Sequence, residues 1–320
     1  MDIQQVFINP TGRLRSGWRL LVFLLLFVAM LFLIGTGARI VYAIALQVVP
    51  NPRLGSYLEN ILFRLTFLAA ALVAAFICTR WLEGLPWRAI GLSLHEGWLR
   101  DFIVGSAIGI ASLALATGIA TAGRGLSFRT FGPGEFFQVG KTLVFSAVLF
   151  VVAALAEEAL FRGYPLQTMS RAGLAGLGVL ITSLAFAGIH VRNPNFKEGI
   201  PLLNLVVAGV WFGVAYLRTR SLWFPLGIHW AWNWALGSLF GLPVSGITSI
   251  APHPLLHGTD LGPAWLTGGT FGIEGGIACT AALLVSTIFI WRTKLVSATE
   301  EMKRLTSQEN PLPAPGPAKL

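Results

Sequence analysis

Charged residues are scarce in this 320-residue chain. Asp, Glu, Lys and Arg together make up 12% of it, whereas a soluble globular domain carries roughly 25%. Hydrophobic residues make up 55%, and the mean hydropathy is +0.71. These values exclude an ordinary soluble domain and predict a membrane protein. The net charge of +9 does not indicate a nucleic-acid partner, because Lys and Arg collect on the cytoplasmic loops of multi-span proteins.

Cysteine is also scarce, and several signature motifs are absent. The two cysteines, Cys78 and Cys279, lie in apolar runs, so we interpret them as small core residues and expect no disulfide. The sequence contains no Walker loop, no dinucleotide-binding loop and no HExxH zinc helix. It also has no serine in a GxSxG setting. These absences argue against nucleotide-driven chemistry, a zincin and an α/β-hydrolase.

What the chain does have is a series of long apolar runs. A membrane-spanning helix needs roughly 17 to 25 mostly apolar residues, and lipid can satisfy the backbone only in helices or closed barrels. The sequence therefore predicts an all-α fold, a polytopic membrane helix bundle of about eight transmembrane helices. Their approximate centres are Phe27, Leu68, Ile110, Leu149, Ile181, Val207, Trp232 and Leu284. Only residues 217–221 separate the sixth and seventh runs, which predicts a tight helical hairpin.

The distribution of positive charge predicts the orientation of these helices. Most of the 23 Lys and Arg residues fall on the segments that share a side with the N-terminus, and the 241–272 loop has none. By the positive-inside rule, we expect a multi-pass protein of the cell membrane with both termini cytoplasmic. We expect residues 1–296 to form the membrane domain, with a catalytic core at 141–240. Residues 297–320, polar and proline-rich toward the end, are expected to be a flexible tail.

Two adjacent carboxylates interrupt the fourth apolar run. Glu157 and Glu158 follow some fifteen apolar or small residues, and a charge at bilayer depth costs a few kcal/mol or more. Arg162 lies four residues after Glu158, the favourable order for an ion pair on one helix face. We therefore predict a structural pair between Glu158 and Arg162. Glu157 has no such local partner, which makes it a candidate general base.

Two histidines follow in later apolar runs, each paired at helical spacing. Phe186 and His190 share one helix face, as do His229 and Asn233. We predict that the side chains of Glu157, His190 and His229 converge in one cavity. A simple helix ending near Arg162 would not allow this, since His190 would lie about 25 Å along the next helix. The fourth helix must then continue past Arg162, or the fifth must tilt. Two other residues, His95 and Glu274, are expected near the surface without a special role.

The three motifs Glu157-Glu158-x-x-x-Arg162, Phe186-x-x-x-His190 and His229-x-x-x-Asn233 resemble those of the CPBP family over residues 141–240. That family, also called Abi, includes type II CAAX prenyl endopeptidases and bacterial proteins linked to bacteriocin processing or self-immunity. The resemblance implies an intramembrane endopeptidase that hydrolyses peptide bonds of membrane-embedded or lipid-modified proteins. It further implies that Glu157 and His190 activate a water, that His229 and Asn233 hold the oxyanion, and that Glu158 and Arg162 support the helix.

Two questions stay open at the level of sequence. The first is the cofactor: a divalent metal such as zinc, held by Glu157, His190 and His229, and a metal-free glutamate mechanism are both compatible with the motifs. The second is the class of function. The alternatives to a protease are a non-enzymatic membrane immunity or scaffold protein and, less favoured, a proton-coupled transporter in which buried Glu and His relay protons. The lack of a detectable internal repeat argues against the transporter.

Overall fold

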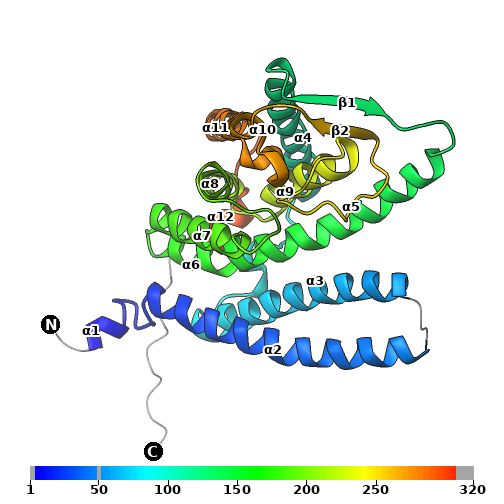
Figure 1. Ribbon diagram of the computed structural model, residues 1–320. Coiled ribbons are helices and arrows are strands. Elements are labelled where there is room, and N and C mark those ends of the chain that lie inside the picture. The colour runs from blue at the N-terminus through cyan, green and yellow to red at the C-terminus, as the bar shows by residue number, and fades with distance from the viewer. Residues whose placement is uncertain (1–3, 49–51, 308–320) are drawn as a thin grey trace, which may run out of the picture.

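The computed structural model describes residues 4–48 and 52–307 (Figure 1). In this part of the chain the regular structure is almost entirely helical, with one sheet of two short strands. Five helices are long and apolar enough to cross a membrane; they span Ser16–Val48, Leu58–Leu82, Trp98–Ala122, Phe136–Arg171 and Ile200–Thr219. The predicted all-α membrane helix bundle is confirmed. Cys78 and Cys279 are buried and unbonded, as expected.

All eight predicted apolar runs are helical, but they differ in length. The long runs form α2 (Ser16–Val48), α3 (Pro52–Ile77), α4 (Trp98–Ala122), α5 (Phe136–Glu158) and α8 (Ile200–Thr219). The other three are shorter: α7 (Ala175–His190) and α11 (Ile277–Arg292) have 16 residues each, and α9 (Trp223–Trp234) has 12. The predicted tight hairpin is present, because α8 ends at Thr219 and α9 begins at Trp223. Hydropathy located the helices but overestimated how many reach spanning length.

The fourth apolar run continues well past Arg162. α5 passes through the π-turn η3 (Ala159–Gly163) into α6 (Tyr164–Arg171), giving one helix of 36 residues, about 54 Å long. Pro165 explains the π-turn, because it lacks the amide that would bond back to the Phe161 carbonyl. After a short turn, α7 packs back along α6 and η3 (Figure 1). This antiparallel return brings His190, the last residue of α7, to the level of Glu157.

α9 lies against α4 at very short range (Figure 1). A Cβ added at Gly227 of α9 would lie 2.2 Å from the Phe102 carbonyl oxygen, and one added at Gly109 of α4 would lie 2.4 Å from that of Ile228. Only glycine permits such approach of two backbones, the usual device for helix association in lipid. This contact fixes the position of the helix that carries His229 and Asn233.

A buried ionic cluster joins the N-terminal helices to the rest of the bundle. Glu83, next to the π-helix η1 (Cys78–Leu82), is 1% exposed and lies 3.3 Å from Arg19 of α2. Its carboxylate also accepts hydrogen bonds from Arg171 and Thr168 of α6, and its backbone carbonyl accepts one from Arg13. Nothing in the sequence marked Glu83, because its partners are distant along the chain. The cluster ties α2, η1 and α6 together.

Outside the long helices, two segments differ from the sequence-based expectation. β1 (Leu126–Thr130) pairs antiparallel with β2 (Leu256–Asp260), and Leu126 is opposite Asp260. The start of the predicted tail forms α12 (Glu300–Thr306), in which Met302 is fully buried; positions 308–320 lie outside the described residues. The predicted surface position of His95 is wrong, because this side chain is 2% exposed and lies 3.1 Å from the Ser221 hydroxyl.

Candidate active site

Glu157 and Glu158 form the last residues of α5, directly before the η3 turn. Adjacent helix positions do not face each other, so the two carboxylates point in different directions. The Glu158 side chain is fully buried, whereas that of Glu157 is 21% exposed. π-turns are frequent at functional sites. Besides η3, the π-turn η4 (Ala235–Leu239) follows the helix that carries His229 and Asn233. The two glutamates therefore have separate surroundings.

Glu158 and Arg162 form the predicted ion pair. Arg162 Nη1 lies 3.0 Å from Glu158 Oε1, and Nη2 donates to the Gly209 carbonyl of α8 at 3.1 Å. The guanidinium also lies over the rings of Phe186 and Phe212, with 4.9 and 5.1 Å to the ring centroids. Both charges are fully buried, so each depends on the other. The pair links α5 and η3 to α7 and α8.

Glu158 has a second partner that the sequence did not indicate. His229 Nδ1 lies 2.9 Å from Glu158 Oε1. A carboxylate accepts hydrogen bonds, so this Nδ1 carries the hydrogen and the other ring nitrogen, Nε2, faces Glu157. The His229 ring also stacks on Phe212, with 4.4 Å between the ring centroids. Glu158 thus orients His229 in addition to pairing with Arg162.

His190 is oriented in a similar way from the opposite side. Its Nδ1 lies 2.8 Å from the Phe186 carbonyl oxygen, one helical turn back. Because a carbonyl can only accept, Nδ1 donates and Nε2 is directed elsewhere. The Nε2 atom lies 3.8 Å from Glu157 Oε2, and the corresponding atom of His229 lies 3.7 Å from the same oxygen. The predicted convergence of Glu157, His190 and His229 is confirmed by these distances.

The separations at Glu157 Oε2 suit a shared water molecule. Distances of 3.7 and 3.8 Å are too long for direct hydrogen bonds but short enough for one water oxygen to bond to the carboxylate and both imidazoles. Within the described residues, Glu157 Oε2 is buried and has no hydrogen-bond partner. An unsatisfied buried carboxylate oxygen is costly, so this geometry favours a polar occupant between the three groups.

A small cavity lies beside the histidines. His190, His229 and Asn233 line it, whereas Glu157 is not on its wall, so the prediction of one cavity shared with Glu157 is wrong. Its volume is about 40 Å³, which accommodates water, since one molecule needs roughly 10–15 Å³, but not a peptide chain. The Asn233 side-chain amide makes no hydrogen bond within residues 4–48 and 52–307, the part of the chain that the structure describes. It is therefore available to a substrate carbonyl.

The same three side chains do not form a metal site as they are placed. Zinc ligands at about 2.0–2.2 Å from the metal would lie roughly 3.3 Å from each other at tetrahedral angles. The distances from Glu157 Oε2 to the two imidazole nitrogens are 3.7 and 3.8 Å. Across the described chain, no group of three or more His, Cys, Asp or Glu side chains is arranged to hold a metal ion. We therefore derive no step through a metal.

Two further charged residues near the site escaped the sequence-based prediction. Glu274 also lines the small cavity, where it accepts hydrogen bonds from Trp232 Nε1 at 2.9 Å and from the Ser245 hydroxyl at 3.0 Å. Arg64 of α3 interacts electrostatically with Glu157. Both come from segments far from the three motifs, and only their placement in apolar surroundings could have drawn attention to them. Glu157 is thus less isolated than its local sequence suggested.

Comparison with known protein families gives one match. Residues 138–235 match the family described as type II CAAX prenyl endopeptidase Rce1-like. This segment runs from the first turn of α5 to the end of α9, and it contains all six predicted site residues: Glu157, Glu158, Arg162, His190, His229 and Asn233. No curated protein and no solved structure matches the chain.

Proposed function

Through residues 138–235 the chain belongs to the CPBP/CAAX protease family, as its three motifs predicted, and we propose that it is an intramembrane endopeptidase with Glu157 as its general base. The observation that carries the proposal is the position of Glu157 Oε2 within 3.8 Å of two imidazole nitrogens, each of which is oriented by a hydrogen bond at its other ring nitrogen. Its substrates are membrane-associated proteins or peptides, lipid-modified ones included.

In the proposed reaction, Glu157 and His190 activate the water. The His190 ring donates from Nδ1 to a carbonyl, so its Nε2 has a free electron pair that can accept a hydrogen bond from the water. Glu157 takes the proton as the water oxygen attacks the carbonyl carbon of the scissile peptide bond. The same carboxyl group then gives the proton to the departing amine. General base catalysis of this kind contributes typically 10²–10⁴-fold in rate.

Stabilisation of the oxyanion falls to Asn233 and His229. Asn233 can donate from its amide without breaking an existing hydrogen bond in the described part of the chain. His229 already donates from Nδ1 to Glu158, so it must also carry a hydrogen on Nε2 to reach the oxyanion. That form is the imidazolium, which the Glu158 carboxylate stabilises directly. Glu158 and Arg162 act as positioning residues, and they do not touch the reacting atoms.

The test is a cleavage assay in proteoliposomes with a prenylated CAAX peptide that carries a fluorophore and a quencher. Glu157→Gln keeps the shape of the side chain but removes the base, so we expect cleavage to fall at least about 10²-fold. Glu198→Gln is the matched control, because Glu198 is exposed in the loop after α7. Equal cleavage by the Glu157→Gln variant and the wild type would refute the proposed role of Glu157, whereas no cleavage by the wild type itself would favour a non-enzymatic binding protein.

A further inference from the structure

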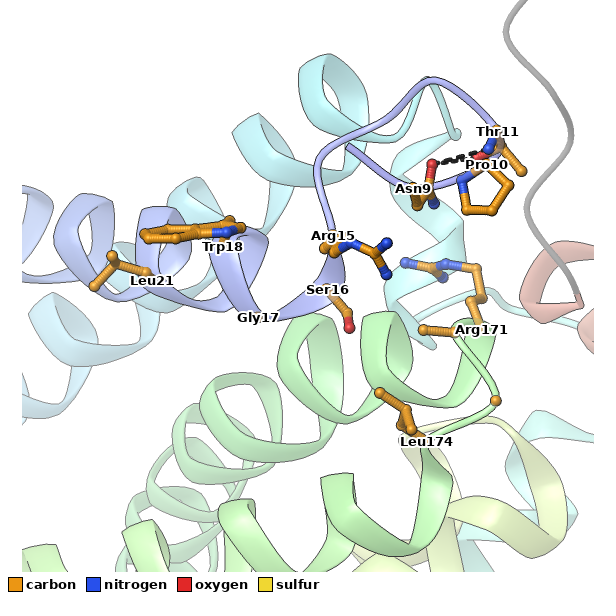
Figure 2. Close-up of a pocket in the computed structure, with 12 residues that line it drawn as sticks. Asn9, Pro10, Thr11, Arg15, Ser16, Gly17, Trp18, Leu21, Arg171 and Leu174 are labelled. Carbon is orange, nitrogen blue, oxygen red and sulfur yellow. Dashed lines mark hydrogen bonds between the residues drawn. The ribbon is translucent and has the colours of Figure 1, made fainter. Parts of the chain in front are cut away.

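Another cavity lies away from the candidate active site. It has a volume of about 830 Å³ and lies between the loop before α2, the first turn of α2 and the turn between α6 and α7 (Figure 2). Hydrogen bonds to the Asn9 side chain from the backbone amides of Thr11 and Arg13 hold the loop in shape. The walls are thus formed by ordered elements and enclose a defined space.

This cavity is positively charged. Arg15 and Arg171 extend into it from opposite walls (Figure 2). The Arg171 side chain is 1% exposed; its Nη2 pairs with Glu83, but its Nε and Nη1 have no hydrogen-bond partner in the described part of the chain. The lining contains neither Asp nor Glu. Two facing guanidinium groups, one of them partly unpaired and buried, repel each other unless an anion lies between them.

The start of α2 adds a third attraction for an anion. Ser16, Gly17 and Trp18 form the first turn of this 33-residue helix and line the cavity. First-turn amides have no acceptor within their own helix, and the helix dipole favours negative charge at this end. Phosphate groups commonly bind at such positions. Backbone amides, Arg15 and Arg171 together therefore match the chemistry of a phosphate.

Part of the lining is apolar, and two of its large side chains belong to a helix of membrane-spanning length. Trp18 and Leu21 of α2 and Leu174 before α7 line the same cavity, and 37%, 44% and 42% of these residues are exposed. A free phosphate ion would gain nothing from these side chains, whereas the acyl chains of a lipid would cover them. Four arginines lie around the site, and in the described part of the chain they are accompanied by one carboxylate, that of Glu83. The four are Arg13, Arg15, Arg19 and Arg171. A zwitterionic headgroup would bring its cationic end toward these arginines.

We propose that this cavity binds an anionic phospholipid, with its phosphate between Arg15, Arg171 and the first turn of α2 and its acyl chains along Trp18, Leu21 and Leu174. Bound in this way, the lipid would bridge α2 and the turn that leads from α6 into α7. The proposal is independent of the peptidase activity and would stand if that activity were absent.

Native mass spectrometry of the detergent-solubilised protein tests the proposal. The protein is titrated with dioleoyl phosphatidylglycerol, with dioleoyl phosphatidylcholine and with inorganic phosphate. We expect one phosphatidylglycerol to bind more tightly than the other two probes. Arg15→Gln should weaken its apparent Kd about tenfold, the loss of one charge-assisted contact. Arg15 is exposed and its guanidinium hydrogen bond is to the Gln5 carbonyl, so its replacement leaves the buried cluster intact.

Two further variants complete the experiment. Arg292→Gln removes an exposed arginine at the end of α11 and should leave the affinity unchanged. Leu174→Gln should weaken lipid binding without affecting inorganic phosphate. Unchanged phosphatidylglycerol affinity in Arg15→Gln, or equal affinity for phosphatidylcholine, would overturn the proposal. Inorganic phosphate that competes at equal concentration would identify a site for a free anion and would also overturn the lipid assignment.

Discussion

Replacement of Gly109 by alanine tests whether the contact between α4 and α9 positions His229 for the proposed reaction. The added Cβ would lie 2.4 Å from the Ile228 carbonyl oxygen. Real Cβ atoms do not approach another heavy atom more closely than about 3.0 Å. The two backbones must therefore separate by at least 0.6 Å, the difference between 3.0 and 2.4 Å, at the residue directly before His229. Overpacking of this kind costs typically about 1–3 kcal/mol.

The same displacement should reduce catalysis more than it reduces folding. His229 Nε2 lies 3.7 Å from Glu157 Oε2, so a shift of His229 changes the position of any water held between these two atoms. A misplacement of about 1 Å can cost on the order of 10²-fold in rate, so we expect peptide cleavage by Gly109→Ala to fall at least about tenfold. The thermal unfolding midpoint in detergent should fall as well.

Gly118 supplies the matched control for this experiment. It lies on the same helix, but a Cβ added there meets no atom within 4 Å. Gly118→Ala should keep wild-type cleavage and should not lower the unfolding midpoint, since alanine is the better helix former. If both variants unfold and cleave alike, the close contact does not position His229, and the reasoning from Gly109 to the active site is wrong.

The remaining predictions concern the site itself. Asn233→Ala should lower kcat by about 10²–10³ with an unchanged unfolding midpoint, measured by steady-state cleavage; a loss that appears only in KM would contradict its oxyanion role. Arg162→Met should leave the buried Glu158 carboxylate with His229 but without its arginine, and destabilise the fold by about 3–5 kcal/mol in chemical unfolding, whereas Glu158→Gln combined with Arg162→Met should cost less than the sum of the two single changes. Activity should survive dialysis against a metal chelator, and a loss that zinc restores would disprove the metal-free reaction.

The features of the candidate site differ in how far the sequence could predict them. Helical spacing was sufficient to pair Glu158 with Arg162, because both residues lie on one helix and their geometry is fixed locally. The meeting of Glu157 with His190 and His229 was predictable only as a requirement on the helices, which the continuation of α5 into α6 fulfils. Periodicity could not give this continuation, since Pro165 would normally mark a helix boundary.

What the sequence missed comes from contacts between distant segments. Glu83 lies outside the apolar runs and no local pattern marks it, yet it is buried among arginines from α2 and α6. His95 was expected on the surface for the same reason and is buried against Ser221. The link between His229 and Glu158 was hidden because the two residues are 71 positions apart. No local pattern encodes which of two adjacent glutamates will meet a given histidine.

The ionic cluster around Glu83 has a consequence for the size of the working unit. The segment that matches the family, residues 138–235, includes Thr168 and Arg171 but none of the other residues of this ionic cluster. Those residues, Arg13, Arg19 and Glu83, precede the matched segment by more than fifty positions. A chain cut down to 138–235 would thus present an uncompensated guanidinium of Arg171 and the bare side of α6 to lipid. The smallest part of this protein that keeps this cluster whole beneath the helices of the candidate site must extend back to Arg13, just before α2.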